Sequence, residues 1–241
     1  MSFEIHAAVS SNASTVDGAT ESDLEDTRLT RATSINQSIT KKNVDDRFLL
    51  SLDQLDSRLF TILSNQSDPD RLIAAKRALE SYKGFDWTIH KRVPIQTPDA
   101  PNGYERVLVA RHEGLYDLLI LSWADVCSPI HDHPCERCFL MPLCGQMVEN
   151  RYEKRDDGSL TLVHSVGIPN GIASWIDDDI GYHSIGNSGK DIACSLHCYI
   201  PGFTRPCTIF DPEQNQLPEV GESIRVRSRA ATWSVCSDKS T

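Results

Sequence analysis

Long apolar runs are missing from this sequence, and so is an N-terminal secretory signal. No segment of the 241 residues approaches the roughly eighteen consecutive apolar residues of a membrane-spanning helix. Residues 1–14 have neither the basic start nor the apolar middle of a signal peptide. These absences make a soluble protein of the cytoplasm the default expectation.

Basic residues are also scarce. The chain has 24 lysines and arginines against 34 acidic residues, which gives a formal net charge of −10. Phosphate binding needs clustered Lys and Arg, and no cluster goes beyond the pair Lys41-Lys42. We therefore expect neither a nucleic acid nor an anionic membrane as the main partner.

The 8 cysteines are expected to be reduced thiols, because a chain of this size without a secretory signal rarely forms a disulfide scaffold. Four of them crowd around two histidines, His131 and His133; these four are Cys127, Cys135, Cys138 and Cys144. A zinc site of mixed cysteine and histidine ligands is therefore an alternative interpretation. Against it, the Cys135-x-x-Cys138 pair has no second pair at zinc-finger spacing.

The chain length favours one domain with a tail. Residues 1–44 are rich in Ser, Thr, Asn and Asp and have few large apolar side chains, so we expect a disordered N-terminal tail. A single domain is expected over residues 45–230. Residues 231–241 are expected to be a frayed C-terminus.

Two short helices are expected at the start of this domain. Apolar side chains recur at three- and four-residue steps from Phe48 to Leu63, which is the spacing of an amphipathic helix. The polar stretch 65–69 interrupts this pattern. Ser67 is expected to cap a second helix that has Pro69 in its first turn.

The rest of the domain is expected to be mainly β. Residues 84–103 contain several prolines, which predicts irregular structure around one short strand. Strands with a period of two are expected over residues 104–110, 116–123, 138–143, 145–152, 159–166, 191–200 and 222–227. Turns at 112–114 and 156–158 join neighbouring strands. Many short antiparallel strands predict a sandwich or jelly-roll barrel with a pocket in its mouth.

Three histidines are candidate metal ligands. In an extended segment, the imidazoles of His131 and His133 leave the same face and can share one metal ion. Cys138 follows His133 after five residues, and Gly145 comes seven residues after that. A third imidazole, His183, comes two residues after a turn glycine.

A line of polar side chains lies on the strand expected over residues 191–200. Ser195, His197 and Tyr199 alternate with two cysteines and a leucine, so the two sets line opposite faces of this strand.

The spacing around the first two histidines resembles the first motif of the cupin family, with Cys138 where a carboxylate usually stands. That replacement is typical of the thiol dioxygenases, and of the type I cysteine dioxygenases in particular. The segments 181–187 and 195–199 resemble the second cupin motif and the Ser-His-Tyr line of the same enzymes. Upstream, YERVLVARHEGLYDLLILSW resembles the family segment that carries a substrate-binding arginine. The chain thus resembles cysteine dioxygenase over about residues 70–215.

The resemblance implies a cupin-type jelly-roll with the short N-terminal helices packed outside. It also implies an Fe(II) enzyme that oxidises L-cysteine with O2 to 3-sulfinoalanine (cysteine sulfinic acid), incorporating both oxygen atoms, in cysteine catabolism toward taurine or sulfate. A monomer that acts on these small molecules is expected. Taurine and sulfate rest on the resemblance alone.

The resemblance further assigns a role to each candidate residue. The metal ligands are His131, His133 and His183; the substrate-binding residues are Arg106 and Tyr104; the catalytic residues are Tyr199, His197, Ser195 and Cys138. A thioether that links the sulfur of Cys138 to the ring of Tyr199 is expected as a protein-derived cofactor.

Three neutral imidazoles would leave the full charge on the metal, so that a substrate thiolate supplies the missing anion. A guanidinium can form two parallel hydrogen bonds with the substrate carboxylate, and Arg111 is the weaker candidate because it lies on the opposite strand face.

Other functions stay open at this point. The chain could act on another small thiol, 3-mercaptopropionate or cysteamine, or it could be a non-catalytic cupin that only binds a metal. Glu136 follows His133 by three residues and could be the cupin carboxylate of a four-ligand site.

Overall fold

The computed structural model describes residues 48–94, 103–177, 179–202, 206–213 and 218–231. The predicted disordered tail, residues 1–44, lies outside these ranges, and so does the C-terminal stretch 232–241. Within the described ranges, none of the helices combines the length and the apolar character needed to cross a membrane.

The first predicted helix is confirmed as α2 (Leu52–Ser64). It begins after Ser51, whose hydroxyl accepts a hydrogen bond from the backbone N–H of Gln54 at 3.2 Å and so caps the helix. Its leucines at positions 52, 55, 59 and 63 are buried, which is the three- and four-residue spacing of one helix face.

The second helix, α3 (Arg71–Ser81), begins later than predicted, and the prediction that Ser67 caps it was wrong. Asp70 is the N-cap residue, and its backbone N–H donates to the Asp68 carboxylate at 2.9 Å. Arg71 donates its backbone N–H to the carbonyl of Asp68 at 3.3 Å. The chain therefore makes a turn through Pro69 before the helix starts.

A 3-10 helix, η1 (Asp86–His90), follows α3. The described part of the stretch 84–103 contains this helix. Residues 95–102 lie outside the described ranges, so the short strand predicted in this stretch stays a prediction. Trp87 is the buried residue of this turn.

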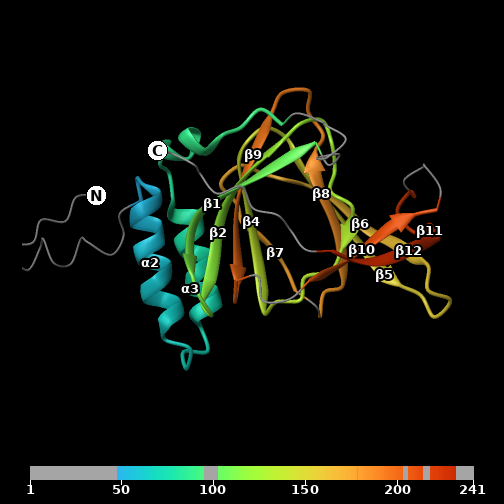
Figure 1. The fold of residues 1–241 in the computed structure, drawn as a ribbon, viewed down its shortest axis with the longest axis horizontal. Helices are drawn as coiled ribbons and strands as arrows, with labels where there is room; N and C mark the ends of the chain where they lie inside the picture. The colour runs from blue at the N-terminus through green and yellow to red at the C-terminus, as the bar shows by residue number, and fades with distance from the viewer. Residues whose placement is uncertain (1–47, 95–102, 178, 203–205, 214–217, 232–241) are drawn as a thin grey trace, which may run out of the picture. The chain divides into compact units, whose positions relative to one another are not determined.

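Two antiparallel sheets form the body of the domain (Figure 1). The first sheet has five strands in the spatial order β1 (Tyr104–His112), β2 (Tyr116–Trp123), β9 (Ala193–Ile200), β4 (Arg137–Cys144) and β7 (Ser174–Ile176). The second has seven strands in the spatial order β11 (Ser223–Ile224), β6 (Leu160–Ile168), β5 (Met147–Lys154), β8 (Tyr182–Asn187), β3 (Ile130–His131), β10 (Cys207–Pro212) and β12 (Val226–Ala231).

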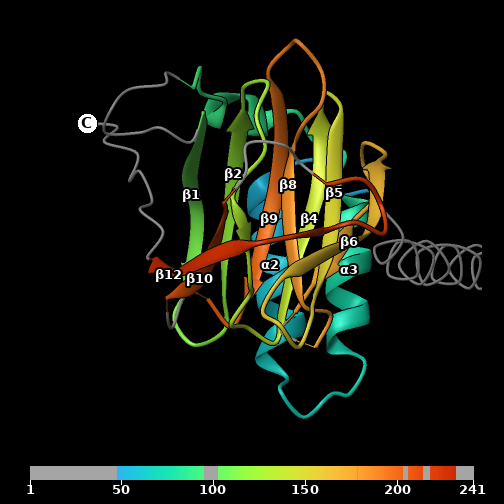
Figure 2. The same ribbon diagram turned by 90° about the vertical axis from the view of Figure 1, so that its right-hand side faces the viewer.

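Each face of the five-stranded sheet packs against a different layer. The outer face carries Leu118, Ile120 and Leu196, which form one core with the buried residues of both helices. The inner face carries Leu119 and Leu121, which form a second core with residues of β5 and β8. Figures 1 and 2 show this order of layers, with α2 and α3 on one side of the five-stranded sheet and the seven-stranded sheet on the other.

The predicted fold class is confirmed, since the domain is mainly β with two short helices packed outside. The turns at Gly114 and Gly158 have φ values of 73° and 84°, which glycine adopts without strain. The predicted strand over residues 222–227 is divided between β11 and β12. Four strands that were not predicted are also present: β3, β7, β8 and β10.

Candidate functional site

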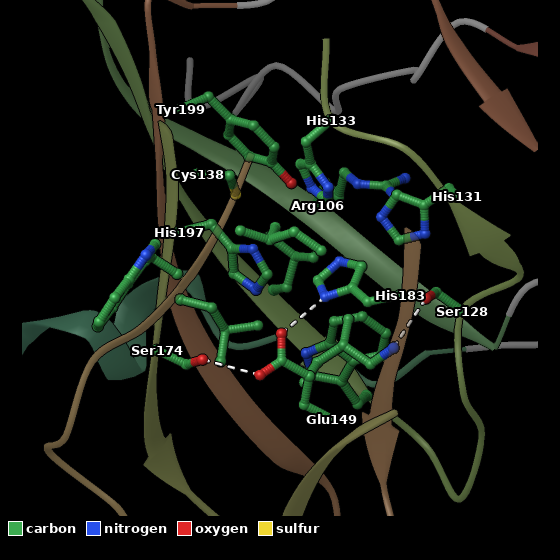
Figure 3. A pocket seen from close by; sticks show the side chains of 16 residues that line it. Arg106, Ser128, His131, His133, Cys138, Glu149, Ser174, His183, His197 and Tyr199 are labelled. Carbon is green, nitrogen blue, oxygen red and sulfur yellow. Dashed lines mark hydrogen bonds and ion pairs between the residues drawn. The ribbon is translucent and has the colours of Figure 1, made fainter. Parts of the chain in front are cut away.

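A pocket lies between the two sheets, on the inner face of the five-stranded one (Figure 3). Its lining residues come from β1, β2, β4, β7 and β9 on one side and from β3, β5 and β8 on the other. The empty space inside it, part of which is open to solvent, is about 360 Å³. Polar and ionisable side chains from segments far apart in the sequence meet at this pocket.

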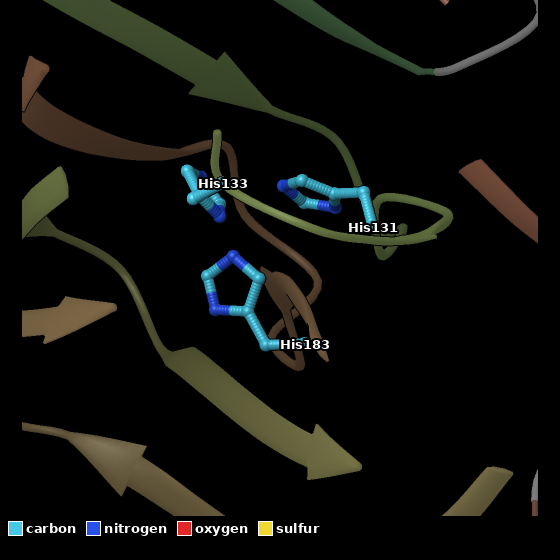
Figure 4. Close-up of side chains that lie close together, drawn as sticks. All are labelled: His131, His133 and His183. Atoms are coloured by element: carbon cyan, nitrogen blue, oxygen red, sulfur yellow. The ribbon is translucent and has the colours of Figure 1, made fainter. Parts of the chain in front are cut away.

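The three histidines predicted as metal ligands come together in this pocket (Figure 4). His131 ends β3 and is paired in register with His183 on β8, and His133 lies two residues beyond His131. One ring nitrogen of each lies within 4.8 Å of those of the other two, and all three side chains are buried. This arrangement offers three nitrogen ligands to a single metal ion.

The ring nitrogens of these histidines are suited to metal binding. Burial, followed by the neighbouring histidines, holds the pKa values of His131 and His133 well below the usual range, so both rings are neutral. Nδ1 of His131 donates to the carbonyl of Pro129 at 2.8 Å, and Nδ1 of His183 lies 2.9 Å from a carboxylate oxygen of Glu149. In both rings, Nε2 is the nitrogen left to bind a metal.

Glu149 was missed by the sequence analysis. Burial alone would raise the pKa of its carboxyl, but the hydrogen bond from His183, the positive charge of Arg151 and a hydrogen bond from Ser174 lower that pKa to about 2. Ser174 Oγ donates to its second oxygen at 2.8 Å (Figure 3). Arg151 Nη2 donates to the same oxygen at 3.0 Å. The sequence did indicate that Glu149 could face the interior, because Met147, Glu149 and Arg151 are two residues apart and so lie on one face of the predicted strand.

Arg106 and Tyr104 occupy the pocket side of β1, as the alternation along this strand requires. Arg106 is 9% exposed as a residue, and its Nη2 donates to the Tyr104 hydroxyl at 3.1 Å. The Tyr104 ring stacks on Trp123, with centroids 4.5 Å apart. The prediction that Arg111 lies on the opposite face was wrong, because a bulge between Leu108 and Ala110 shifts the alternation along β1. Arg111 forms an ion pair with Asp117 at 2.7 Å farther along the strand and does not line the pocket.

The polar line predicted on β9 faces the same pocket. Trp123 Nε1 donates to Ser195 Oγ at 2.8 Å, and Ser195 Oγ shares a hydrogen bond of 2.9 Å with Nε2 of His197. Burial, followed by the charge of Arg106, lowers the pKa of His197 well below its usual range, so the ring is neutral. Burial raises the pKa of Tyr199 well above its usual range, so its hydroxyl keeps its proton.

Cys138 and Tyr199 face each other across neighbouring strands. They are direct register partners on β4 and β9, so their side chains leave the same face of the sheet as neighbours. Burial raises the pKa of Cys138 well above the usual value for a thiol. Figure 3 shows the sulfur beside the Tyr199 side chain at the edge of the pocket.

Two alternative ligand sets do not form. Glu136 is 42% exposed at its side chain and makes a two-pronged ion pair with Arg71 of α3 at 2.5 and 2.6 Å, so it is not the carboxylate of a four-ligand site. The metal-binding cluster found in the described part of the chain contains histidines and no cysteine, which argues against the mixed zinc site.

Comparison with known proteins identifies relatives of this chain. The family model described as "Cysteine dioxygenase type I" matches residues 76–213. A cysteine dioxygenase type 1 from Danio rerio is 38% identical over 154 residues, which cover 61% of this chain and 73% of the relative. The Homo sapiens cysteine dioxygenase type 1 is 36% identical over 112 residues, which cover 45% of this chain and 56% of that relative. The match thus spans about half the length of the human relative.

Solved structures with a partial likeness include cupins. An oxalate oxidase in complex with glycolate aligns with a TM-score of 0.33 and 22% identity over 42% of this chain and 52% of the other. A cupin superfamily protein from Desulfitobacterium hafniense aligns with a TM-score of 0.31 and 12% identity over 41% of this chain and 78% of the other.

Proposed function

Because this chain belongs to the type I cysteine dioxygenase family, we propose that it converts L-cysteine and O2 into 3-sulfinoalanine. The thiolate sulfur gains both oxygen atoms of one O2 molecule and gives up four electrons, which reduce that molecule, so no further reductant is needed. The observation that carries the proposal is that one pocket joins three buried histidines to a buried guanidinium.

His131, His133 and His183 would hold the iron(II) of this enzyme. The residues fit such an ion, because their nitrogens converge, their side chains are buried, and imidazole is a good ligand for iron. Bound iron(II) would supply the positive charge that favours a substrate thiolate and the one-electron chemistry that lets O2 react with it. Glu149 keeps the proton of His183 on Nδ1, so Nε2 stays available as the ligand atom.

Arg106 would bind the substrate carboxylate. Its guanidinium can present two parallel N–H donors to a carboxylate, and its buried position strengthens that interaction. The Tyr104 hydroxyl accepts a hydrogen bond from Nη2 of the guanidinium, and the Tyr104 ring stacks on Trp123. Together these contacts orient the guanidinium. A substrate held in this way has its thiol group directed toward the histidines across the pocket.

Tyr199 would act as a proton donor beside the reacting sulfur. Its hydroxyl keeps its proton at neutral pH, and its ring stacks against His133 and His197 at centroid distances of 5.9 and 6.0 Å. The chain of hydrogen bonds from Trp123 through Ser195 holds His197 in place next to it. The thioether predicted between Cys138 and Tyr199 would form by loss of one hydrogen from the thiol and one from the ring, with O2 as the oxidant.

The arginine favours cysteine over the alternative thiols. Cysteamine has no carboxylate, so it would lack the group that can accept two parallel hydrogen bonds from the Arg106 guanidinium. 3-Mercaptopropionate has the carboxylate but lacks the amine, so it would give up one of the two atoms through which cysteine can bind a metal.

Oxygen uptake by iron-loaded protein tests the proposal. Anaerobically loaded protein should consume one O2 for each L-cysteine and yield sulfinate that carries two labelled oxygen atoms, and cysteine should outcompete the other two thiols. The His183→Ala variant should fold and consume no O2. If the iron-loaded protein consumes no O2 with any of the three thiols, the proposed dioxygenase activity is wrong, and a non-catalytic metal-binding cupin is the remaining interpretation.

A further inference from the structure

A second pair of facing side chains lies at the other end of β4 and β9 from Cys138 and Tyr199. Cys144, the last residue of β4, is the register partner of Cys194 near the start of β9. The register shifts between Pro142 and Cys144, and after this bulge both cysteines pack with the core beneath the helices. These two thiols therefore lie outside the pocket, on the outer face of the five-stranded sheet.

The two strands approach each other closely at this end. A Cβ added at Gly145 would lie 2.4 Å from the Cβ of Ala193, so glycine is required beside Cys144. Facing residues of antiparallel strands have Cα atoms about 4.5–5.5 Å apart, which lies inside the roughly 4.4–6.8 Å range of disulfides.

We propose that Cys144 and Cys194 form a reversible dithiol–disulfide site that hydrogen peroxide oxidises. Peroxide first converts the Cys144 thiol into a sulfenic acid and releases one water. The sulfur of Cys194 then attacks the sulfur of Cys144, the S–S bond forms, and a second water leaves. In total the two thiols lose two hydrogens and two electrons, and one peroxide becomes two waters.

The order of these steps follows from the surroundings of the two thiols. Cys194 has no exposed surface, whereas Cys144 is partly exposed. Burial raises the pKa of Cys194 to about 11, so it is a protonated and protected thiol at neutral pH. Peroxide therefore reaches Cys144 first, and Cys194 acts as the resolving thiol already in place across the strand pair.

The disulfide would stabilise the fold. It closes a loop that runs from residue 144 to residue 194, and a cross-link over such a loop reduces the conformational freedom of the unfolded chain. It also joins the two strands whose register sets Cys138 against Tyr199. Oxidised protein should therefore unfold at a higher temperature than reduced protein.

Peptide mapping of the full chain tests this site. The protein is treated with hydrogen peroxide, unfolded, alkylated and digested, and the same sample is analysed with and without dithiothreitol. We expect one cross-linked peptide pair that contains Cys144 and Cys194 and is separated by dithiothreitol. A thioether would survive this reductant, so the two modifications, each a loss of two hydrogens, are told apart.

Two variants serve as test and control. Cys144→Ser should lose the cross-linked peptide and the rise in unfolding temperature on oxidation, whereas Cys127→Ser, which alters an exposed thiol, should keep both. The proposal is overturned if Cys144 and Cys194 of the wild-type protein both remain open to alkylation after peroxide treatment that oxidises Cys127. It is also overturned if Cys194 is found joined to a cysteine other than Cys144.

Discussion

Removing the charge of Glu149 should weaken metal binding without removing any ligand. The change Glu149→Gln keeps the size of the side chain and an oxygen that can accept the Nδ1–H of His183. It removes the negative charge that stabilises this hydrogen bond and that pairs with Arg151 at 3.0 Å. The His183 ring then becomes a weaker and less firmly oriented ligand.

The size of this effect follows from the burial of the carboxylate, which is 2% exposed. A hydrogen bond to a charged group contributes about 1.5–3 kcal/mol and a neutral one about 0.5–1.5 kcal/mol, so the variant should lose about 1–1.5 kcal/mol. That loss corresponds to roughly a tenfold lower metal affinity. Glu149→Ala, which removes the acceptor as well, should approach the roughly 100-fold loss seen when such supporting groups are deleted.

Competition between the protein and a chelator of known affinity for Fe(II), under anaerobic conditions, measures this affinity. Glu213→Gln is the matched control, because Glu213 pairs with Arg227 at 3.4 Å on the exposed surface and should leave metal affinity unchanged. Thermal unfolding of each variant shows whether it is folded. If folded Glu149→Gln and Glu149→Ala both bind the metal within twofold of the wild type, Glu149 does not position His183.

Three further changes have separate expected outcomes. Arg106→Lys should lower kcat/KM for L-cysteine by about 10- to 100-fold, mainly through KM, because a lysine cannot form the two parallel hydrogen bonds. Steady-state O2 uptake measures this effect, and the control variant Arg111→Lys should keep the kcat/KM of the wild type. Cys138→Ala should abolish the deficit of two hydrogens in intact mass that active wild-type protein is expected to show, and a deficit that persists in the variant would exclude the thioether. Leu59→Ala should destabilise the fold by about 2–5 kcal/mol in denaturant unfolding, because this side chain is fully buried between helix and sheet. Ile73→Ala, at an exposed position of α3, should cost about 0.5 kcal/mol or less.

Local sequence patterns were sufficient to predict the elements with a clear period. A strand places alternate side chains on opposite faces, so Ser195, His197 and Tyr199 could be assigned to one face of β9 before the structure was known. The same reasoning failed for Arg111, because a bulge between Leu108 and Ala110 shifts the alternation and brings Arg111 to the same face of β1 as Arg106. Long, strongly periodic segments therefore gave the fold class and the polar line of β9, whereas the three histidines were found from their spacing and its resemblance to the cupin motifs.

Features that depend on contacts between distant segments could not be predicted in this way. Strands β3 and β7 contain two and three residues, too few to show any period. The link between Glu149 and His183 joins β5 to β8, and it depends on a register that only the folded sheet sets. The cap of α3 was misassigned because Ser67 and Asp70 both have side chains suited to an N-cap, and the turn at Asp68 decides between them.

Both the pocket and the hydrophobic core between the five-stranded sheet and the helices depend on the pairing of β4 with β9. In the observed register, Cys138 faces Tyr199 and Leu140 faces His197 on the inner side, while Phe139 packs with the outer core. A slip of one residue would exchange the two faces of one strand, because side chains alternate with a period of two. Such a slip would bury the polar line of β9 among the leucines beneath the helices and take Ser195 away from the Trp123 N–H that donates to it. The hydrophobic outer face therefore fixes the register that the polar inner face needs, and a covalent link at Cys144 and Cys194 would hold that register from the outer side.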